Sequence, residues 1–176
     1  MERKHRDQGG LFAVEGTQEI GLALAQGFSA EASLLCPERM RSAADQALAE
    51  RLSTLKKNPL AVAESVFKQL TYMESSSILL ICHQKQDTLA DLAARKARLI
   101  LVVAGIEKPG NLGALLRTAH GCRWDAVVVT DKHIDIWNPN CIRASRGSLF
   151  CLPLVETSSD QLIPWLKQRN FHIYTA

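Results

Sequence analysis

Two short apolar segments with a helical pattern between them restrict the fold more than any other feature of this sequence. They are residues 99–104 (LILVVA) and Ala126–Thr130 (AVVVT), and neither alternates apolar with polar residues. An unbroken apolar run of this length is typical of a strand covered on both faces. Such strands usually belong to parallel sheets, whose strands need helical crossovers. The second half of the chain is therefore predicted to form a βαβ arrangement.

The alternation of strand and helix patterns extends over the whole chain and predicts an α/β protein with mostly parallel sheets in two small parts. Further strands are expected at residues 11–14, 32–36, 60–62, 78–82, 152–155 and 171–175. Helices are expected over residues 17–27, with Thr17 as N-cap, and over 38–55, 65–73, 112–120, 140–145 and 159–169. A basic stretch at 89–98 separates the two series, so we predict one domain over residues 1–94 and another over 95–176.

The composition excludes several classes of protein. Hydrophobic residues make up 47% and charged residues 22% of the chain, as in ordinary globular domains. The longest apolar runs are about a third of the ~20 residues that a membrane helix needs. The charged N-terminal residues are not followed by the apolar segment of a signal peptide. We therefore predict a soluble, cytoplasmic protein without a membrane partner. The net charge of +3 permits a polyanionic partner without requiring one.

The cysteines and histidines give no sign of a metal site. The five cysteines form no CxxC pair, and the five histidines show no metal-binding spacing. Most of the cysteines lie in or beside apolar runs, so we expect buried free thiols, no disulfide and no metal.

The stretch 107–119 (EKPGNLGALLRTA) is the first that carries chemistry. Pro109 and Gly110 predict a tight turn after a strand, and Asn111 lies where a helix begins. The free N–H groups of a helix start suit a phosphate. Gly113 permits close approach of a ligand or of another backbone, and Arg117, one turn further on, has a planar fork that can hold a phosphate by two bonds. The alternative is an ordinary βα unit in which Arg117 is a solvated surface residue.

The second such stretch is 135–150 (DIWNPNCIRASRGSLF). Arg143, Ser145 and Arg146 place small polar and cationic groups beside a strand. Open α/β folds bind ligands in loops at the carboxyl ends of parallel strands. The alternative is a surface loop with two solvated arginines.

These stretches resemble the SpoU (TrmH-like) RNA ribose methyltransferases of the SPOUT superfamily. NLGALLRTA resembles the family's first motif, Asn-x-Gly-x-x-x-Arg, whose positions Asn111, Gly113 and Arg117 fill. The segment 135–153 resembles the family's Asn-Pro, Arg-Ala-Ser-x-Gly-Ser and Leu-Pro sequence. Residues 10–16 (GLFAVEG) resemble the opening of the family's N-terminal RNA-binding domain, an α/β module similar to a ribosomal protein.

The resemblance implies an RNA 2′-O-ribose methyltransferase, acting on ribosomal or transfer RNA, that uses S-adenosylmethionine. Arg117 and Asn111 are the implied catalytic residues: Arg117 grips a phosphate and stabilises the 2′ oxygen, and Asn111 orients Arg117 or the ribose. The predicted RNA contacts are Arg3, Lys4, Arg6, Glu15, Gly16, Gly113, Arg143, Ser145 and Arg146.

The sequence departs from the family in one respect: the family's second and third motifs do not appear before Ala176. In the family these two motifs form the knot of the SPOUT fold. We therefore expect only the first, Rossmann-like part of the methyltransferase domain, as an engineered fragment or a truncated gene product that is inactive by itself. The cofactor pocket is expected beyond Ala176. A homodimer is expected for the complete enzyme, and a monomer or weak dimer for this chain.

Two other functions stay open. A non-catalytic RNA-binding module derived from such an enzyme would need only the N-terminal part, whose basic clusters include Lys56 and Lys57. A small-molecule nucleotide binder is disfavoured because there is no GxGxxG or Walker pattern. Phe12, Phe28 and Phe67 lie in apolar surroundings and are predicted to be core residues, so the sequence predicts no base-stacking surface.

Overall fold

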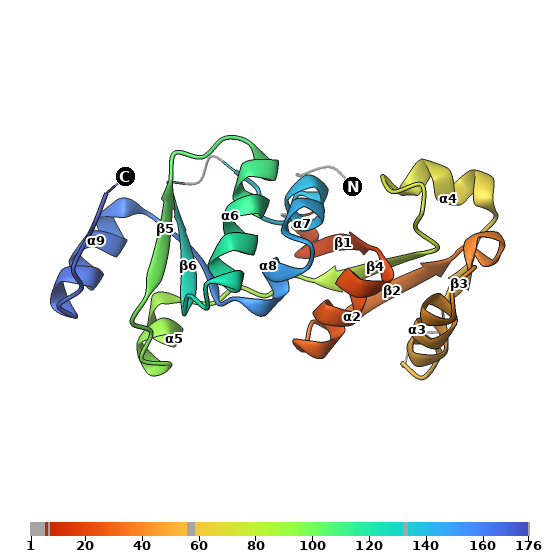
Figure 1. The fold of residues 1–176 in the computed structure, drawn as a ribbon, viewed down its shortest axis with the longest axis horizontal. Helices are drawn as coiled ribbons and strands as arrows, with labels where there is room; N and C mark the ends of the chain where they lie inside the picture. Colours follow the sequence, from red (N-terminus) through yellow and green to blue (C-terminus); the bar gives the residue numbers. More distant parts are fainter. Residues whose placement is uncertain (1–5, 7, 56–58, 132–133, 176) are drawn as a thin grey trace.

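A computed structural model of the protein describes residues 6, 8–55, 59–131 and 134–175. They form two β-sheets with helices packed between them (Figure 1). The N-terminal sheet has the order β1-β4-β2-β3, and the C-terminal sheet has the order β5-β6-β7. The α/β class predicted from the sequence is confirmed.

The N-terminal sheet differs from the parallel arrangement that the sequence predicted. Its strands are β1 (Leu11–Glu15), β2 (Ala30–Leu35), β3 (Leu60–Ala61) and β4 (Ile78–His83). The central strand β4 pairs antiparallel with both β1 and β2, and only β2 and β3 are parallel. The prediction of a mostly parallel sheet was wrong here, because an apolar strand such as β4 is equally apolar in an antiparallel sheet that is covered on both faces.

The C-terminal sheet is parallel, as the sequence predicted. Strands β5 (Ile100–Ala104) and β7 (Leu154–Thr157) flank β6 (Ala126–Thr130), all five residues of which are buried. The predicted strand at 171–175 is wrong, because this segment has no strand conformation. Instead, Phe171 stacks on Trp165 of the preceding helix, with ring centroids 5.7 Å apart, so the segment folds back along that helix.

Most of the predicted helices form, with shifted ends. The helices are α2 (Thr17–Ala25), α3 (Ala43–Ser53), α4 (Glu64–Leu70), α5 (Leu89–Ala94), α6 (Pro109–Gly121), α7 (Pro139–Ser145), α8 (Ser148–Cys151) and α9 (Ser159–Gln168). The single helix predicted over 38–55 is broken: a short 3-10 turn, Pro37–Arg39, precedes α3, which starts anew at a capping box made by Ser42 and Asp45. Gly16, not Thr17, is the N-cap of α2, and the Thr17 hydroxyl donates to the Asp45 carboxylate.

One hydrophobic core joins the two sheets. Phe12 of β1 and Leu80 of β4 belong to the same buried cluster as Val127 and Val129 of β6. Trp137, from the loop before α7, stacks on Phe12 with a centroid distance of 4.6 Å. The predicted core roles of Phe12, Phe28 and Phe67 are confirmed, since all three are buried.

The outer face of the C-terminal sheet is covered by α5 and α9. Leu92 of α5 packs with Ala126 and Val128 of β6 and with Leu162 of α9. By its packing, α5 thus belongs with the C-terminal sheet, although it lies on the N-terminal side of the boundary predicted at residue 94. Among the described residues, no helix is long and apolar enough to cross a membrane.

Candidate functional site

Helices α6 and α7 cross at Gly113, and this crossing organises the candidate site. Gly113 is buried in the first turns of α6, which begins after the turn at Lys108 and Pro109. A Cβ placed on Gly113 would lie 2.6 Å from the Cβ of Ala144 and 2.6 Å from the carbonyl oxygen of Cys141. Only a residue without a side chain fits this contact. Of the two roles predicted for Gly113, close approach of another backbone is the one that the structure shows.

Arg117 lies one helical turn beyond this crossing, on the side of α6 that faces the α7–α8 connection. The row of residues 113, 117 and 120 follows one side of the helix. Gly113 meets Ala144 at one end of that row, and the His120 ring nitrogen Nδ1 lies 3.3 Å from the Ser148 hydroxyl at the other. The helical spacing therefore puts Arg117 on the same side of α6 as Gly113 and His120, the residues through which α6 contacts α7 and α8.

The surface around the α7–α8 connection is basic. The helical segments Pro109–Gly121 and 139–151 contain Arg117, Arg143 and Arg146 but neither Asp nor Glu. All three arginines are exposed, and no described residue is a hydrogen-bond or ion-pair partner of Arg117. Exposed guanidinium groups are suited to binding phosphate.

Asn111 is exposed in the first turn of α6. It lies six residues before Arg117, so the two residues are separated by about 9 Å along the helix axis. No described hydrogen bond connects them. Asn111 is therefore available to a ligand rather than placed to orient Arg117.

The structure uses two predicted RNA contacts for its own packing. Ser145 is fully buried, and its hydroxyl donates to the Ile142 carbonyl oxygen at 2.7 Å. Arg6 is 4% exposed and forms an ion pair with the buried carboxylate of Asp135, with Nε 3.0 Å from Oδ2. Neither group faces solvent: the guanidinium of Arg6 binds the loop that carries Trp137, and RNA contacts of Arg6 and Ser145 stay predictions.

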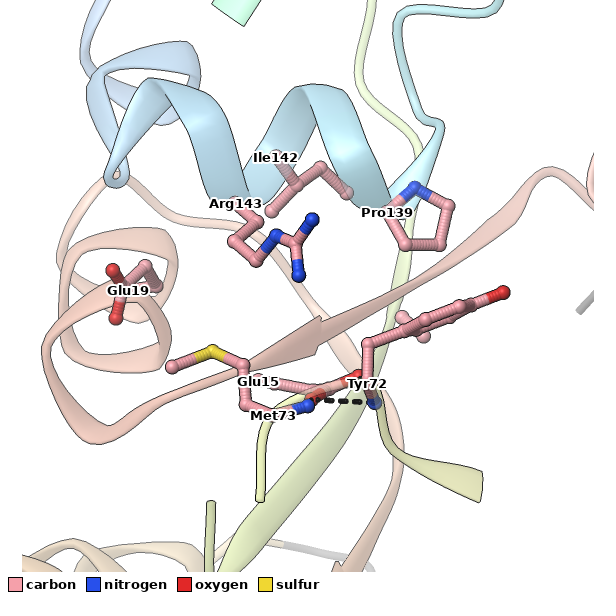
Figure 2. A pocket seen from close by; sticks show the side chains of 8 residues that line it. Glu15, Glu19, Tyr72, Met73, Pro139, Ile142 and Arg143 are labelled. Atoms are coloured by element: carbon pink, nitrogen blue, oxygen red, sulfur yellow. Dashed lines mark hydrogen bonds between the residues drawn. The ribbon is translucent and has the colours of Figure 1, made fainter. Parts of the chain in front are cut away.

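Glu15 and Gly16 lie where β1 turns into α2, next to a pocket between the N-terminal sheet and α7 (Figure 2). The Glu15 carboxylate accepts hydrogen bonds from the backbone N–H groups of Tyr72 and Met73, at 3.0 and 2.9 Å. Gly16 has φ of 90°, and its missing side chain leaves the space that the Glu19 carboxylate occupies. Both residues thus shape this pocket, which also contains Arg143.

Other predicted residues cannot be placed, and one relevant residue was not predicted. Arg3, Lys4, Lys56 and Lys57 lie outside the described residues. Tyr72, which lines the pocket with its side chain 61% exposed, was not singled out by the sequence analysis. Its sequence neighbours are Thr71 and Met73, and nothing in this local pattern distinguishes an exposed tyrosine in a loop from a core residue.

The thiols are structural where they are buried. Cys36, Cys82 and Cys141 are buried, Cys151 is half-buried and Cys122 is exposed. Burial raises the pKa of Cys82 and of Cys141 to about 12, which keeps both protonated at neutral pH. In the described ranges, no three His, Cys, Asp or Glu side chains come together as metal ligands.

Two family models match separate segments of the chain. Residues 1–80 match the MRM3-like substrate binding domain, and residues 98–176 match the SpoU rRNA Methylase family. The segment between the two matches contains α5.

Two bacterial relatives are similar over much of the chain. The 23S rRNA (guanosine(2553)-2'-O)-methyltransferase RlmP of Bacillus subtilis is 32% identical over 114 residues, which are 64% of this chain and 44% of that protein. The 23S rRNA (uridine(2479)-2'-O)-methyltransferase of Streptomyces viridochromogenes is 26% identical over 171 residues, 96% of this chain and 58% of that protein. The chain thus spans about half the length of these relatives.

Solved structures show the same fold. The SpoU methyltransferase AviRb from Streptomyces viridochromogenes, in complex with the cofactor AdoMet, superposes with a TM-score of 0.83 at 26% identity, covering 96% of this chain and 64% of that one. An RNA 2'-O ribose methyltransferase superposes with a TM-score of 0.73 at 31% identity, with the same coverage of 96% and 64%.

Proposed function

Residues 98–176 belong to the SpoU rRNA Methylase family, and from this premise we propose that the chain forms part of an RNA 2′-O-ribose methyltransferase that uses S-adenosylmethionine. The substrate that we propose is ribosomal RNA, because both bacterial relatives are 23S rRNA methyltransferases. The proposal places the protein in the cytoplasm, with RNA as its partner.

The observation that carries the proposal is the position of Arg117. The Gly113 crossing fixes α6 against α7, and Arg117 presents an exposed guanidinium, with no partner among the described residues, on the side of the helix that also carries Gly113 and His120. A free arginine has a pKa above ~12 and is a poor general base. We assign it instead to holding the phosphate next to the target ribose and to stabilising negative charge that develops on the 2′ oxygen.

The other exposed residues of this surface would position the RNA. Arg143 and Arg146 add phosphate contacts from α7 and its last turn. Asn111, at the start of α6, would donate a hydrogen bond to the ribose or to the phosphate. Each of these groups is exposed, so RNA can reach it without any change in the packing of α6 and α7.

S-adenosylmethionine supplies the methyl group when it is bound. The described residues offer little to hold it: at the carboxyl end of β6, the Thr130 hydroxyl is buried without a partner. A single hydroxyl offers few of the contacts that such a cofactor needs, and no residue from the ends of β5 or β6 lines the pocket beside Arg143 or the one beside Lys85. The described residues by themselves therefore do not fit the cofactor.

We also propose a homodimer for the complete enzyme. The edge strand β5, the residue before it and the segment after α9 expose apolar side chains that suit such a contact: Leu99 and Val102 are 48% and 40% exposed, and Ile173 is 51% exposed.

The proposed reaction is tested by incubating the complete gene product that contains these residues with ribosomal RNA and radiolabelled S-adenosylmethionine. Alkaline hydrolysis cleaves RNA except after a 2′-O-methylated nucleotide, so the label is expected in dinucleotides that resist the alkali. Label in mononucleotides alone would show base methylation and would contradict the proposal. RNA binding without any methyl transfer would favour the non-catalytic RNA-binding module.

A further inference from the structure

The pocket between the two domains combines an exposed aromatic ring with both signs of charge (Figure 2). It is a shallow depression that is open to solvent. The N-terminal domain contributes Ala13, Glu15, Glu19, Tyr72 and Met73, and the C-terminal domain contributes Pro139, Ile142 and Arg143.

The backbone that carries Tyr72 is fixed, whereas its ring is free. Both oxygens of the Glu15 carboxylate accept from the Tyr72 N–H, at 3.0 and 3.1 Å, and Oε2 also accepts from the Met73 N–H at 2.9 Å. These bonds tie the 72–73 segment to the end of β1. Tyr72 is 61% exposed at the pocket, so its ring is accessible to a ligand.

The polar groups of the pocket leave both donors and acceptors available. Figure 2 shows the Arg143 guanidinium extending from α7 toward the side on which Tyr72 and Met73 lie. Its Nη2 donates to the Asn140 side chain at 3.1 Å, and no described carboxylate forms an ion pair with it, although Glu15 and Glu19 line the same pocket. Glu19 is partly exposed and lies over Gly16.

We propose that this pocket binds one unpaired nucleotide of the RNA, with its base stacked on the Tyr72 ring. A nucleobase matches the pocket because it has a π face together with donors and acceptors on its edge, whereas a phosphate alone would use only Arg143. Arg143 contacts the phosphate or an acceptor on the base, and Glu19 accepts from an exocyclic amine. The inference rests on the proposed function, since it takes RNA as the substrate.

The test measures the affinity of the 176-residue chain for a short unstructured RNA oligonucleotide, by fluorescence anisotropy. Tyr72→Ala is expected to weaken binding roughly 5- to 100-fold, the range for loss of one stacked base, whereas Tyr72→Phe keeps the ring and should keep the affinity. Tyr174→Ala is the matched control, because Tyr174 is 90% exposed and does not line the pocket. The same RNA paired with its complement is expected to bind more weakly and to be insensitive to Tyr72→Ala, because its bases are stacked in the duplex.

A second measurement uses the unmodified chain, so its result does not depend on whether a variant folds. RNA carrying 5-iodouridine is irradiated in the complex, and the crosslinked peptide is identified by mass spectrometry. The expected crosslink is at Tyr72, and crosslinks confined to other residues would contradict the proposal.

The two proposals fail in different ways. Unchanged affinity of Tyr72→Ala, or an equal loss in Tyr174→Ala, would overturn the nucleotide pocket while RNA binding by the wild-type chain stands. No RNA binding by the wild-type chain at low salt would overturn the nucleotide pocket together with the RNA-binding part of the proposed function.

Discussion

Gly113 of α6 and Ala144 of α7 approach so closely that a Cβ on residue 113 would lie 2.6 Å from the Cβ of Ala144. The contact connects the two stretches that stood out in the sequence, Asn-x-Gly-x-x-x-Arg and Arg-Ala-Ser-x-Gly-Ser. It also determines where Arg117 lies, because a rigid helix extends from this crossing. The glycine of the first stretch is thus a packing residue, and its effect on the proposed chemistry is indirect.

Replacing Gly113 with alanine is expected to destabilise the protein. The added methyl overlaps both a side chain and a backbone carbonyl, and such overpacking costs about 1–3 kcal/mol. Gly121→Ala, in the last turn of the same helix, is the control, because nothing lies within 4 Å of its new Cβ. Urea unfolding measures both free energies, and an equal effect of the two substitutions would contradict the tight crossing.

The buried ion pair between Arg6 and Asp135 is expected to hold the N-terminal segment against the loop before α7. Asp135→Asn removes the negative charge from this buried ion pair, and breaking a buried pair costs about 3–5 kcal/mol of unfolding free energy. The double variant Arg6→Met with Asp135→Asn should lose less than the sum of the single variants. The exposed pair Glu64–Lys68 serves as the comparison: Lys68→Met should cost at most about 1 kcal/mol. Additive losses at Arg6 and Asp135 would show that the two groups do not interact.

Alkylation should distinguish the cysteines. Cys82 and Cys141 have a pKa of about 12, so at pH 8 very little of either thiol is in the reactive thiolate form. Both thiols are also buried and therefore inaccessible to the reagent. Iodoacetamide is expected to modify the exposed Cys122 first, as read by peptide mass spectrometry. Raising the pH toward 12 increases the thiolate fraction at the two buried sites. Labelling of Cys82 as fast as Cys122 in the folded chain at pH 8 would contradict the burial.

The sequence predicted some parts of this structure better than others for physical reasons. Ala126–Thr130 is apolar along its length and is buried, as is typical of a strand in a parallel sheet, so the parallel βαβ unit could be predicted. Residues 99–104 are equally apolar, although Leu99 and Val102 are exposed at the edge of the sheet. The antiparallel pairing of β4 could not, because its hydrophobic pattern depends on burial rather than on strand direction. The failed strand at 171–175 has a strand-like pattern, but its Phe171 packs on α9.

The sequence predicted the motif of the candidate site, but not which of the residues around that motif are buried or exposed. The spacing of Asn111, Gly113 and Arg117 is a local property of one helix and can be read from the sequence. The burial of Arg6 depends on Asp135, which is 129 residues away, and the accessibility of Tyr72 depends on its backbone bonds to Glu15. Such long-range contacts leave no pattern in the residues next to the ones they affect.

The proposed role of Arg117 is tested most directly by the rate of methyl transfer. This rate is measured under single-turnover conditions with the complete gene product, RNA and S-adenosylmethionine, and cofactor binding is measured in parallel. Arg117→Ala is expected to slow transfer roughly 10²- to 10³-fold, comparable to the loss of one donor to a developing oxyanion. Arg117→Lys should remain severely impaired because it loses the two-bond fork. Cofactor binding should be unchanged in both variants, and Arg98→Ala, which removes an exposed arginine outside α6, α7 and α8, should transfer normally. Near-normal transfer by Arg117→Ala would contradict the assignment, as would loss of transfer together with loss of cofactor binding.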